Sequence, residues 1–122
     1  MIRAIIIDDE EHCIKSLQSD LKMFCPGVEI TDTCQSAKEG MLSIKRNNPD
    51  LIFLDVEMPW MNGFEMLEIM NREINFHIIF TTAYNEFAVQ AFRVSAVDYL
   101  LKPIDSNDLV NAVEKAKKSY RR

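Results

Sequence analysis

The chain alternates short, almost wholly apolar runs with amphipathic segments, and this alternation limits the possible folds more than any other feature of the sequence. The first run, Ile2 to Ile7, is aliphatic except for Arg3, which is typical of a strand buried on both faces of a sheet. Each run precedes a segment whose apolar residues recur every three or four positions, as in an amphipathic helix. Five such units predict an α/β fold with a doubly wound, five-stranded parallel sheet, because each right-handed crossover returns the chain parallel to the previous strand.

Caps and helix breakers set the expected boundaries. Strands are expected at residues 2–7, 28–34, 51–54, 78–82 and 96–101, the second at a sheet edge because polar residues alternate through it. Ser36 and Glu39 predict a capping box for the second helix, and Asp105 or Ser106 should cap the last one. A fourth, weaker helix is expected at residues 86–92. The residues expected on inner helix faces include Ile14, Leu17, Leu21, Phe24, Ala88, Ala91, Phe92, Leu109, Ala112 or Val113, and Ala116.

Length, charge and cysteine content narrow the class of protein. The 122 residues, 48% hydrophobic, suit one domain, which we place at residues 1–118, with residues 119–122 as the start of a linker or tail. A net charge of −5 argues against nucleic-acid binding by the domain itself. The three cysteines show no C-x-x-C spacing, so neither a disulfide framework nor a zinc site is indicated. Without a long apolar run or a signal-peptide pattern, we expect a soluble, cytoplasmic protein that does not contact membranes.

The apolar run Leu51 to Leu54 ends in a charged residue, Asp55, where the predicted strand should reach the surface. Ligands of open α/β sheets bind beyond the carboxyl ends of the strands, so a carboxylate at this position should be presented rather than hidden. Asp55 could equally open a turn before Pro59. The stretch by itself does not decide between these two interpretations.

Further polar residues follow the other strands. Asp8 and Asp9 come after the first strand, Thr82 ends the fourth, and Lys102 follows the fifth. Because the carboxyl ends of parallel strands share one edge, these side chains should gather around Asp55. Three clustered carboxylates repel one another unless a cation lies among them, and a hard ion such as Mg²⁺ suits them. A hydroxyl and an ammonium opposite the metal suit a phosphoryl group, with Asp55 as the nucleophile.

The ordered combination of Asp8-Asp9, Asp55, Thr82-Ala83 and Lys102-Pro103 resembles the receiver domain of bacterial response regulators, the acceptor half of two-component signalling. The resemblance covers essentially the whole chain. It implies a flavodoxin-like receiver fold with strand order 2-1-3-4-5. It also implies a phosphoprotein of a phosphorelay, in which a sensor histidine kinase is the partner, and a signalling module instead of an enzyme acting on a separate substrate.

The resemblance assigns the metal and the phosphoryl group to particular residues. Asp55 would accept the phosphoryl group from a phosphohistidine. Asp9, Asp55 and the backbone carbonyl of Glu57 would ligate Mg²⁺, while Asp8 would order the water shell of the metal.

The same resemblance assigns the remaining matching positions. Thr82 and Lys102 would bind the phosphoryl oxygens. Tyr99 would be an aromatic switch that turns inward when Thr82 moves toward the phosphate. The peptide bond between Lys102 and Pro103 is expected to be cis, a geometry that only a minority of prolines adopt.

Two positions, Glu57 and Tyr84, depart from the commonest receiver variants and flank the path by which water would attack the acyl phosphate. We hypothesise that the bulk of Tyr84 slows dephosphorylation. The segments 80–88 and 96–104 also resemble the LytTR-type regulators, whose receivers precede a DNA-binding domain. DNA would then be contacted only through an output domain that this chain lacks, for transcription regulation, and phosphorylation could produce a homodimer. The basic segment from Lys115 is either the start of that linker or a solvated helix end.

Two other functions compete with the receiver interpretation. A phosphohydrolase resembling the haloacid-dehalogenase family also uses an aspartate nucleophile beside Mg²⁺, but it needs a second aspartate two residues later, where Glu57 stands. A receiver-shaped module that is never phosphorylated has no need for the intact acids, Thr82 and Lys102.

Other conspicuous residues have simpler interpretations. His12 is interpreted as a surface helix residue and His77 as a strand-entry residue, because neither falls among the edge acids. Trp60 follows Asp55 in the next loop and, if exposed, could contact the kinase. Packing and loop contacts are the expected role of Met58, Met61, Met66 and Met70.

Overall fold

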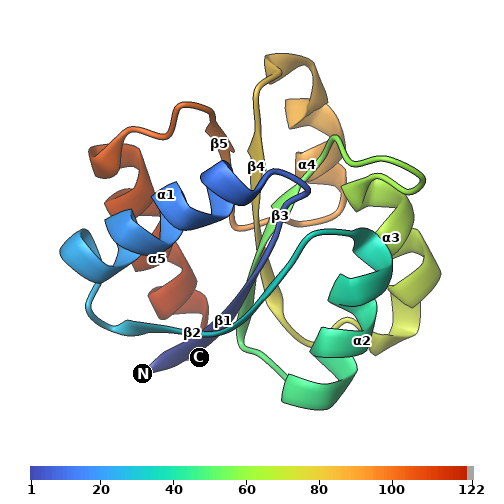
Figure 1. The fold of residues 1–122 in the computed structure, drawn as a ribbon, viewed down its shortest axis with the longest axis horizontal. Helices are drawn as coiled ribbons and strands as arrows, with labels where there is room; N and C mark the ends of the chain where they lie inside the picture. Colours follow the sequence, from blue (N-terminus) through green and yellow to red (C-terminus); the bar gives the residue numbers. More distant parts are fainter. Residues whose placement is uncertain (121–122) are drawn as a thin grey trace.

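The computed structural model describes residues 1–120, with side chains through residue 119, and shows the predicted alternation of strands and helices (Figure 1). The strands are β1 (Ile2–Ile7), β2 (Val28–Cys34), β3 (Leu51–Asp55), β4 (His77–Thr82) and β5 (Asp98–Leu101). The helices are α1 (Glu11–Phe24), α2 (Ala37–Asn47), α3 (Gly63–Met70), α4 (Ala88–Arg93) and α5 (Ser106–Tyr120), with short 3₁₀ turns at Asn71–Glu73 and Asn85–Phe87. Helix α5 continues through residues 119 and 120 of the expected tail, and residues 121 and 122 lie outside the described residues.

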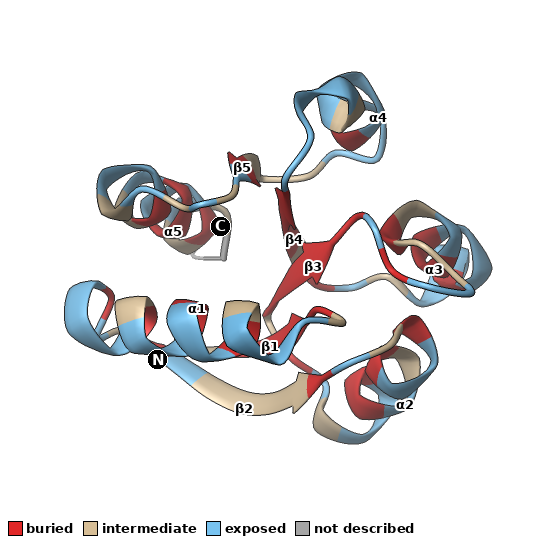
Figure 2. Ribbon diagram, turned by 45° about the horizontal axis from the view of Figure 1, so that its top comes forward, coloured by how far each residue is buried: buried red, intermediate tan, exposed pale blue. Residues whose placement is uncertain are grey.

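All neighbouring strands pair in parallel, and their order is β2-β1-β3-β4-β5, which confirms the predicted fold. Helices α1 and α5 cover one face of the sheet, and α2, α3 and α4 lie on the other (Figure 1). Within β1, Ala4 and Ile6 pack into the core beneath α1 and α5, whereas Ile5 and Ile7 pack into the core beneath α2 and α3. Both faces of the central strands are therefore buried, as the continuous apolar runs require (Figure 2).

The edge position of β2 and the inner face of α5 are also as predicted. Strand β2 forms one edge of the sheet and is only partly buried along its middle. The side chain of Asp105 accepts hydrogen bonds from the backbone amides of Asn107 at 3.1 Å and Asp108 at 3.3 Å, so Asp105 is the cap of α5. The buried residues of α5 are Leu109, Ala112, Val113 and Ala116.

The cap of α2 differs from the prediction, and α3 has a capping box that the sequence analysis did not predict. The Ser36 hydroxyl accepts from the Glu39 amide at 3.1 Å as expected, but the Glu39 carboxylate accepts from the amide of Gln35 at 3.3 Å instead of that of Ser36. A complete capping box is present at α3, where Asn62 and Glu65 accept each other's backbone amide hydrogens at 2.9 Å. Spacing alone does not show which amide the glutamate reaches, since that depends on the chain direction before the helix.

Helix α4 differs most from the prediction. The chain forms a 3₁₀ turn first, and the α-helix begins only at Ala88. Ala91 is buried as expected, but Ala88 is exposed and Phe92 is 84% exposed. A six-residue helix makes fewer than two turns, so few of its positions can face the sheet. Phe24 is also more exposed than predicted, because Cys25, the residue after α1, occupies the buried position at the helix end.

The buried methionines of this core are Met58, Met66 and Met70, and Met61 is half-buried against it. The expectation that these four residues make packing contacts is therefore confirmed. Among the described residues, no helix is long and apolar enough to cross a membrane.

We predict that Gly63→Ala destabilises the domain by about 1–3 kcal/mol, the usual cost of overpacking. A Cβ atom at Gly63 would lie 2.6 Å from the backbone oxygen of Asp55, which cannot move without displacing the end of β3. Urea denaturation measures the change. Gly27→Ala is the matched control, because a Cβ there would meet only the flexible end of Lys117 at 3.1 Å. Equal stabilities of the two variants would contradict the prediction.

Candidate functional site

The carboxyl ends of β1, β3 and β5 bring the predicted acidic residues and the lysine together. Asp8 follows β1, Asp55 is the last residue of β3, and the two strands pair side by side. Carboxylate oxygens of Asp8, Asp9 and Asp55 all lie within 4.8 Å of one another. Lys102 follows β5, and its Nζ lies 2.8 Å from Asp8 Oδ2 and 3.6 Å from Asp55 Oδ2.

Asp55 is more deeply buried than the sequence suggested. We expected its carboxylate to be presented at the surface, but Asp55 is only 3% exposed, as is Asp8. The loop after β3 explains the difference, since the amide of Val56 donates to the carbonyl of Thr81 at 3.3 Å and the carbonyl of Val56 accepts from Gly63 at 3.0 Å. These bonds fold the loop back beside the strand end.

Burial and like charge act together on Asp55. Loss of solvent and the negative charge of Asp8 raise the pKa of Asp55 to about 7, although Lys102 works in the opposite direction. Without a bound metal ion, the Asp55 carboxyl group is therefore protonated in a substantial fraction of the molecules near neutral pH. Three carboxylates this close are hard oxygen donors of the kind that Mg²⁺ binds, so the residues present fit a divalent metal.

Lys102 is the positive group of the site. Burial lowers the pKa of its ammonium, but the hydrogen bond to Asp8 and the charges of Asp55 and Asp8 outweigh burial and raise the pKa to about 12. Lys102 is therefore charged throughout the neutral range. The peptide bond between Lys102 and Pro103 is cis, as expected.

Thr82 and Tyr99 are connected to each other through the loop after β4. Thr82 is fully buried, and its hydroxyl accepts a hydrogen bond from the amide of Tyr84 at 3.2 Å. The Tyr99 hydroxyl donates to the carbonyl of Tyr84 and accepts from the amide of Phe87 at 3.3 Å. Both predicted switch residues therefore hydrogen-bond to the backbone of Tyr84, Thr82 to its amide and Tyr99 to its carbonyl.

The remaining predicted positions flank Asp55 and the loop. The backbone amide of Glu57 donates to Asp55 Oδ1 at 3.3 Å, while the Glu57 side chain is exposed. The Tyr84 side chain is 50% exposed and packs edge-on against the ring of Phe87. Trp60 is fully exposed in the loop after β3, with a positive φ of 73°.

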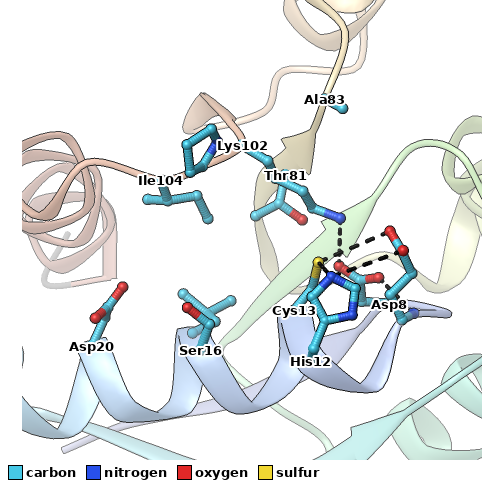
Figure 3. Close-up of a pocket in the computed structure, with 12 residues that line it drawn as sticks. Asp8, His12, Cys13, Ser16, Asp20, Thr81, Ala83, Lys102 and Ile104 are labelled. Atoms are coloured by element: carbon cyan, nitrogen blue, oxygen red, sulfur yellow. Dashed lines mark hydrogen bonds and ion pairs between the residues drawn. The ribbon is translucent and has the colours of Figure 1, made fainter.

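A cleft of about 410 Å³ opens beside the acidic site, between the start of α1 and the segment after β5 (Figure 3). Lys102 reaches across it toward Asp8. Its lining also includes Glu10, His12 and Cys13, none of which the sequence analysis assigned to a site. The one signal in the sequence is the three-residue spacing of Glu10 and Cys13 across the start of the helix, since residues three apart lie on the same helix face.

The family model of the response regulator receiver domain matches residues 4–114. An uncharacterised response regulatory protein of Yersinia pestis is 42% identical over 113 residues, which are 93% of this chain and 47% of that protein. The transcriptional regulatory protein BtsR of Escherichia coli strain K12 is 40% identical over 105 residues, which are 86% of this chain and 44% of BtsR. The chain thus spans about half the length of these curated relatives.

Solved structures show the same fold. The response regulatory domain of protein mrkE from Klebsiella pneumoniae superposes with a TM-score of 0.88 at 26% identity, covering 98% of both chains. The receiver domain of AraT from Geobacillus stearothermophilus superposes with a TM-score of 0.86 at 28% identity, covering 98% of this chain and 95% of that one.

The raised pKa of Asp55 predicts how the metal-free domain responds to pH. The pKa of Asp55 is near 3.8 in the unfolded chain and about 7 in the folded domain. The stability that this group contributes is therefore fully present below pH 3.8 and is lost as the pH rises through about 7. Asp55→Asn removes this loss. In the presence of a chelator at pH 8, the free energy of unfolding of the variant should therefore exceed that of the wild type by about 1 kcal/mol or more. The difference should shrink toward pH 4. Urea denaturation across this range measures it, and a pH-independent difference would contradict the assignment.

Proposed function

Because this chain belongs to the response regulator receiver domain family, we propose that it is a phosphoacceptor that takes a phosphoryl group on Asp55 from a sensor histidine kinase. The observation that carries the proposal is the arrangement of Asp55 beside Asp8, Asp9 and Lys102 at one edge of the sheet. Core packing does not require three carboxylates there. Phosphoryl transfer does use such a site, because it depends mainly on positioning and on neutralising charge.

The transfer forms an oxygen–phosphorus bond at the Asp55 carboxylate and breaks the nitrogen–phosphorus bond of the phosphohistidine, whose imidazole leaves and takes up a proton. Asp55, Asp9 and the backbone carbonyl of Glu57 would hold Mg²⁺, with Asp8 ordering its water. When bound, Mg²⁺ supplies positive charge for the phosphoryl oxygens. Lys102, charged at neutral pH and 3.6 Å from Asp55, would bind another phosphoryl oxygen.

The proposed switch begins at Thr82. Its hydroxyl would move from the Tyr84 amide to a phosphoryl oxygen on Asp55, so the loop after β4 would lose one of its contacts. Tyr99 contacts the same residue through the Tyr84 carbonyl and would turn inward in response. The surface of α4 and β5 would then change, which could drive homodimer formation or contact with an output domain.

The wider context is also part of the proposal. We propose a LytTR-type regulator that acts in the cytoplasm, with a DNA-binding output domain outside this chain. Support comes from the 40% identity to BtsR, which is named a transcriptional regulatory protein, and from the length of the relatives beyond the matched region. Trp60, fully exposed in the loop after Asp55, would contact the kinase.

We predict that incubation with Mg²⁺ and acetyl phosphate adds one phosphoryl group per chain, as measured by mass spectrometry. Asp55→Ala should abolish the addition, while Asp50→Ala, which removes a carboxylate at the opposite end of β3, should not. Rapid release of phosphate over many turnovers would favour a haloacid-dehalogenase-like phosphohydrolase. No modification of the wild type would favour a receiver-shaped interaction module.

We further predict that Tyr84→Ala shortens the lifetime of the phosphorylated domain several-fold, corresponding to about 1 kcal/mol in the barrier. The aromatic ring would otherwise restrict water near the acyl phosphate. Tyr84→Phe is the matched control, since it keeps the ring and removes only the hydroxyl. Loss of the phosphoryl group over time measures the rates, and a Tyr84→Ala rate equal to that of the wild type would refute the role of the ring.

A further inference from the structure

Three chemically different donor groups converge at the start of α1, outside the acidic site. Cys13 Sγ lies 3.6 Å from His12 Nε2 and 3.9 Å from Glu10 Oε1. His12 Nε2 lies 3.9 Å from the other carboxylate oxygen of Glu10, Oε2. The thiol, imidazole and carboxylate thus form a compact triangle, separate from the carboxylates of Asp8, Asp9 and Asp55.

The dimensions of this triangle match a tetrahedral metal site. Bond lengths of about 2.3 Å to sulfur, 2.0–2.1 Å to imidazole nitrogen and 2.0–2.2 Å to carboxylate oxygen place tetrahedral ligands roughly 3.3–3.6 Å apart. The sulfur–nitrogen separation of 3.6 Å falls at the upper end of that range. The sulfur and the nitrogen each lie 3.9 Å from a different oxygen of the Glu10 carboxylate, a few tenths of an ångström beyond it. Glu10 and His12 are exposed, so small rotations of their side chains could close the difference.

The surroundings favour a cation and leave room for a fourth ligand. All three residues line the cleft of about 410 Å³, so a water molecule or small ligand could complete the coordination (Figure 3). The Lys102 ammonium lines the same cleft, but it is paired with the carboxylates of Asp8 and Asp55, which offset its repulsion of an incoming ion.

We propose that Glu10, His12 and Cys13 bind a borderline-soft divalent transition metal ion such as Zn²⁺. Imidazole and thiolate select such ions over Mg²⁺, which prefers oxygen ligands. Binding breaks the S–H bond of Cys13, releases its proton to solvent and forms a metal–sulfur bond. This site shares no residue with the acidic cluster, although both line one cleft and the amide of Glu10 donates to Asp8 Oδ1 at 2.9 Å.

Co²⁺ is a suitable spectroscopic probe, added to the wild-type chain in the presence of excess Mg²⁺ to occupy the carboxylates. We expect one Co²⁺ per chain, a near-ultraviolet thiolate-to-cobalt charge-transfer band and the intense visible bands of tetrahedral cobalt. Titration with Zn²⁺ should remove these bands. Absence of the charge-transfer band, or loss of cobalt binding when Mg²⁺ is added, would overturn the proposal.

Substitutions identify the ligands. Cys13→Ser should abolish the charge-transfer band, and His12→Ala should weaken Zn²⁺ binding by at least about tenfold, the lower end of the loss seen even for outer-shell residues. The matched controls are Cys25→Ala and His77→Ala, which change the same residue types away from the cleft and should leave binding unchanged. Circular dichroism checks that each variant is folded. Unchanged binding in Cys13→Ser, or equal losses in the controls, would show that the ion binds elsewhere.

Discussion

The carboxylates of Asp8 and Asp55 lie at the ends of two adjacent buried strands, and the ammonium of Lys102 bridges them. Burying such charges costs several kcal/mol each unless they are paired, so this part of the sheet depends on the lysine being in place. Lys102 follows β5, which is separated from β3 by β4. The ion pairs therefore form only when four neighbouring strands, β1, β3, β4 and β5, and the helices that cover them have assembled, which connects the chemistry of the site to the completeness of the fold.

One ammonium among three carboxylates leaves the site short of positive charge. The consequence is visible at Asp55, where burial and the charge of Asp8 raise the pKa to about 7. A protonated carboxylate is a poor nucleophile, so a bound cation would both relieve the repulsion and restore the reactive form. The shortage of positive charge among these carboxylates is thus the property that a metal-dependent phosphoacceptor site needs.

The loop after β4 and helix α4 provide the part of the molecule best suited to move. Thr82 and Tyr99 both hydrogen-bond to the backbone of Tyr84, so a displacement of either side chain changes the contacts of the other. Helix α4 has six residues, of which only Ala91 is buried, and few apolar contacts therefore oppose its movement. The large core residues are concentrated in the central strands, which lets the sheet stay fixed while this segment changes.

The sequence by itself determined the alternation of strands and helices, the edge position of β2 and the inner face of α5, because the period of the apolar residues can be read from their order. It also determined that Asp8, Asp55 and Lys102 lie together, because the carboxyl ends of parallel strands share one edge of the sheet. Only the tertiary structure decided how deeply Asp55 is buried and which side chains of α4 face solvent. His12 is an exposed residue of α1, as predicted, and the tertiary structure decided only which groups lie beside it. These features depend on loops folding back and on side-chain directions, which contacts between distant residues set.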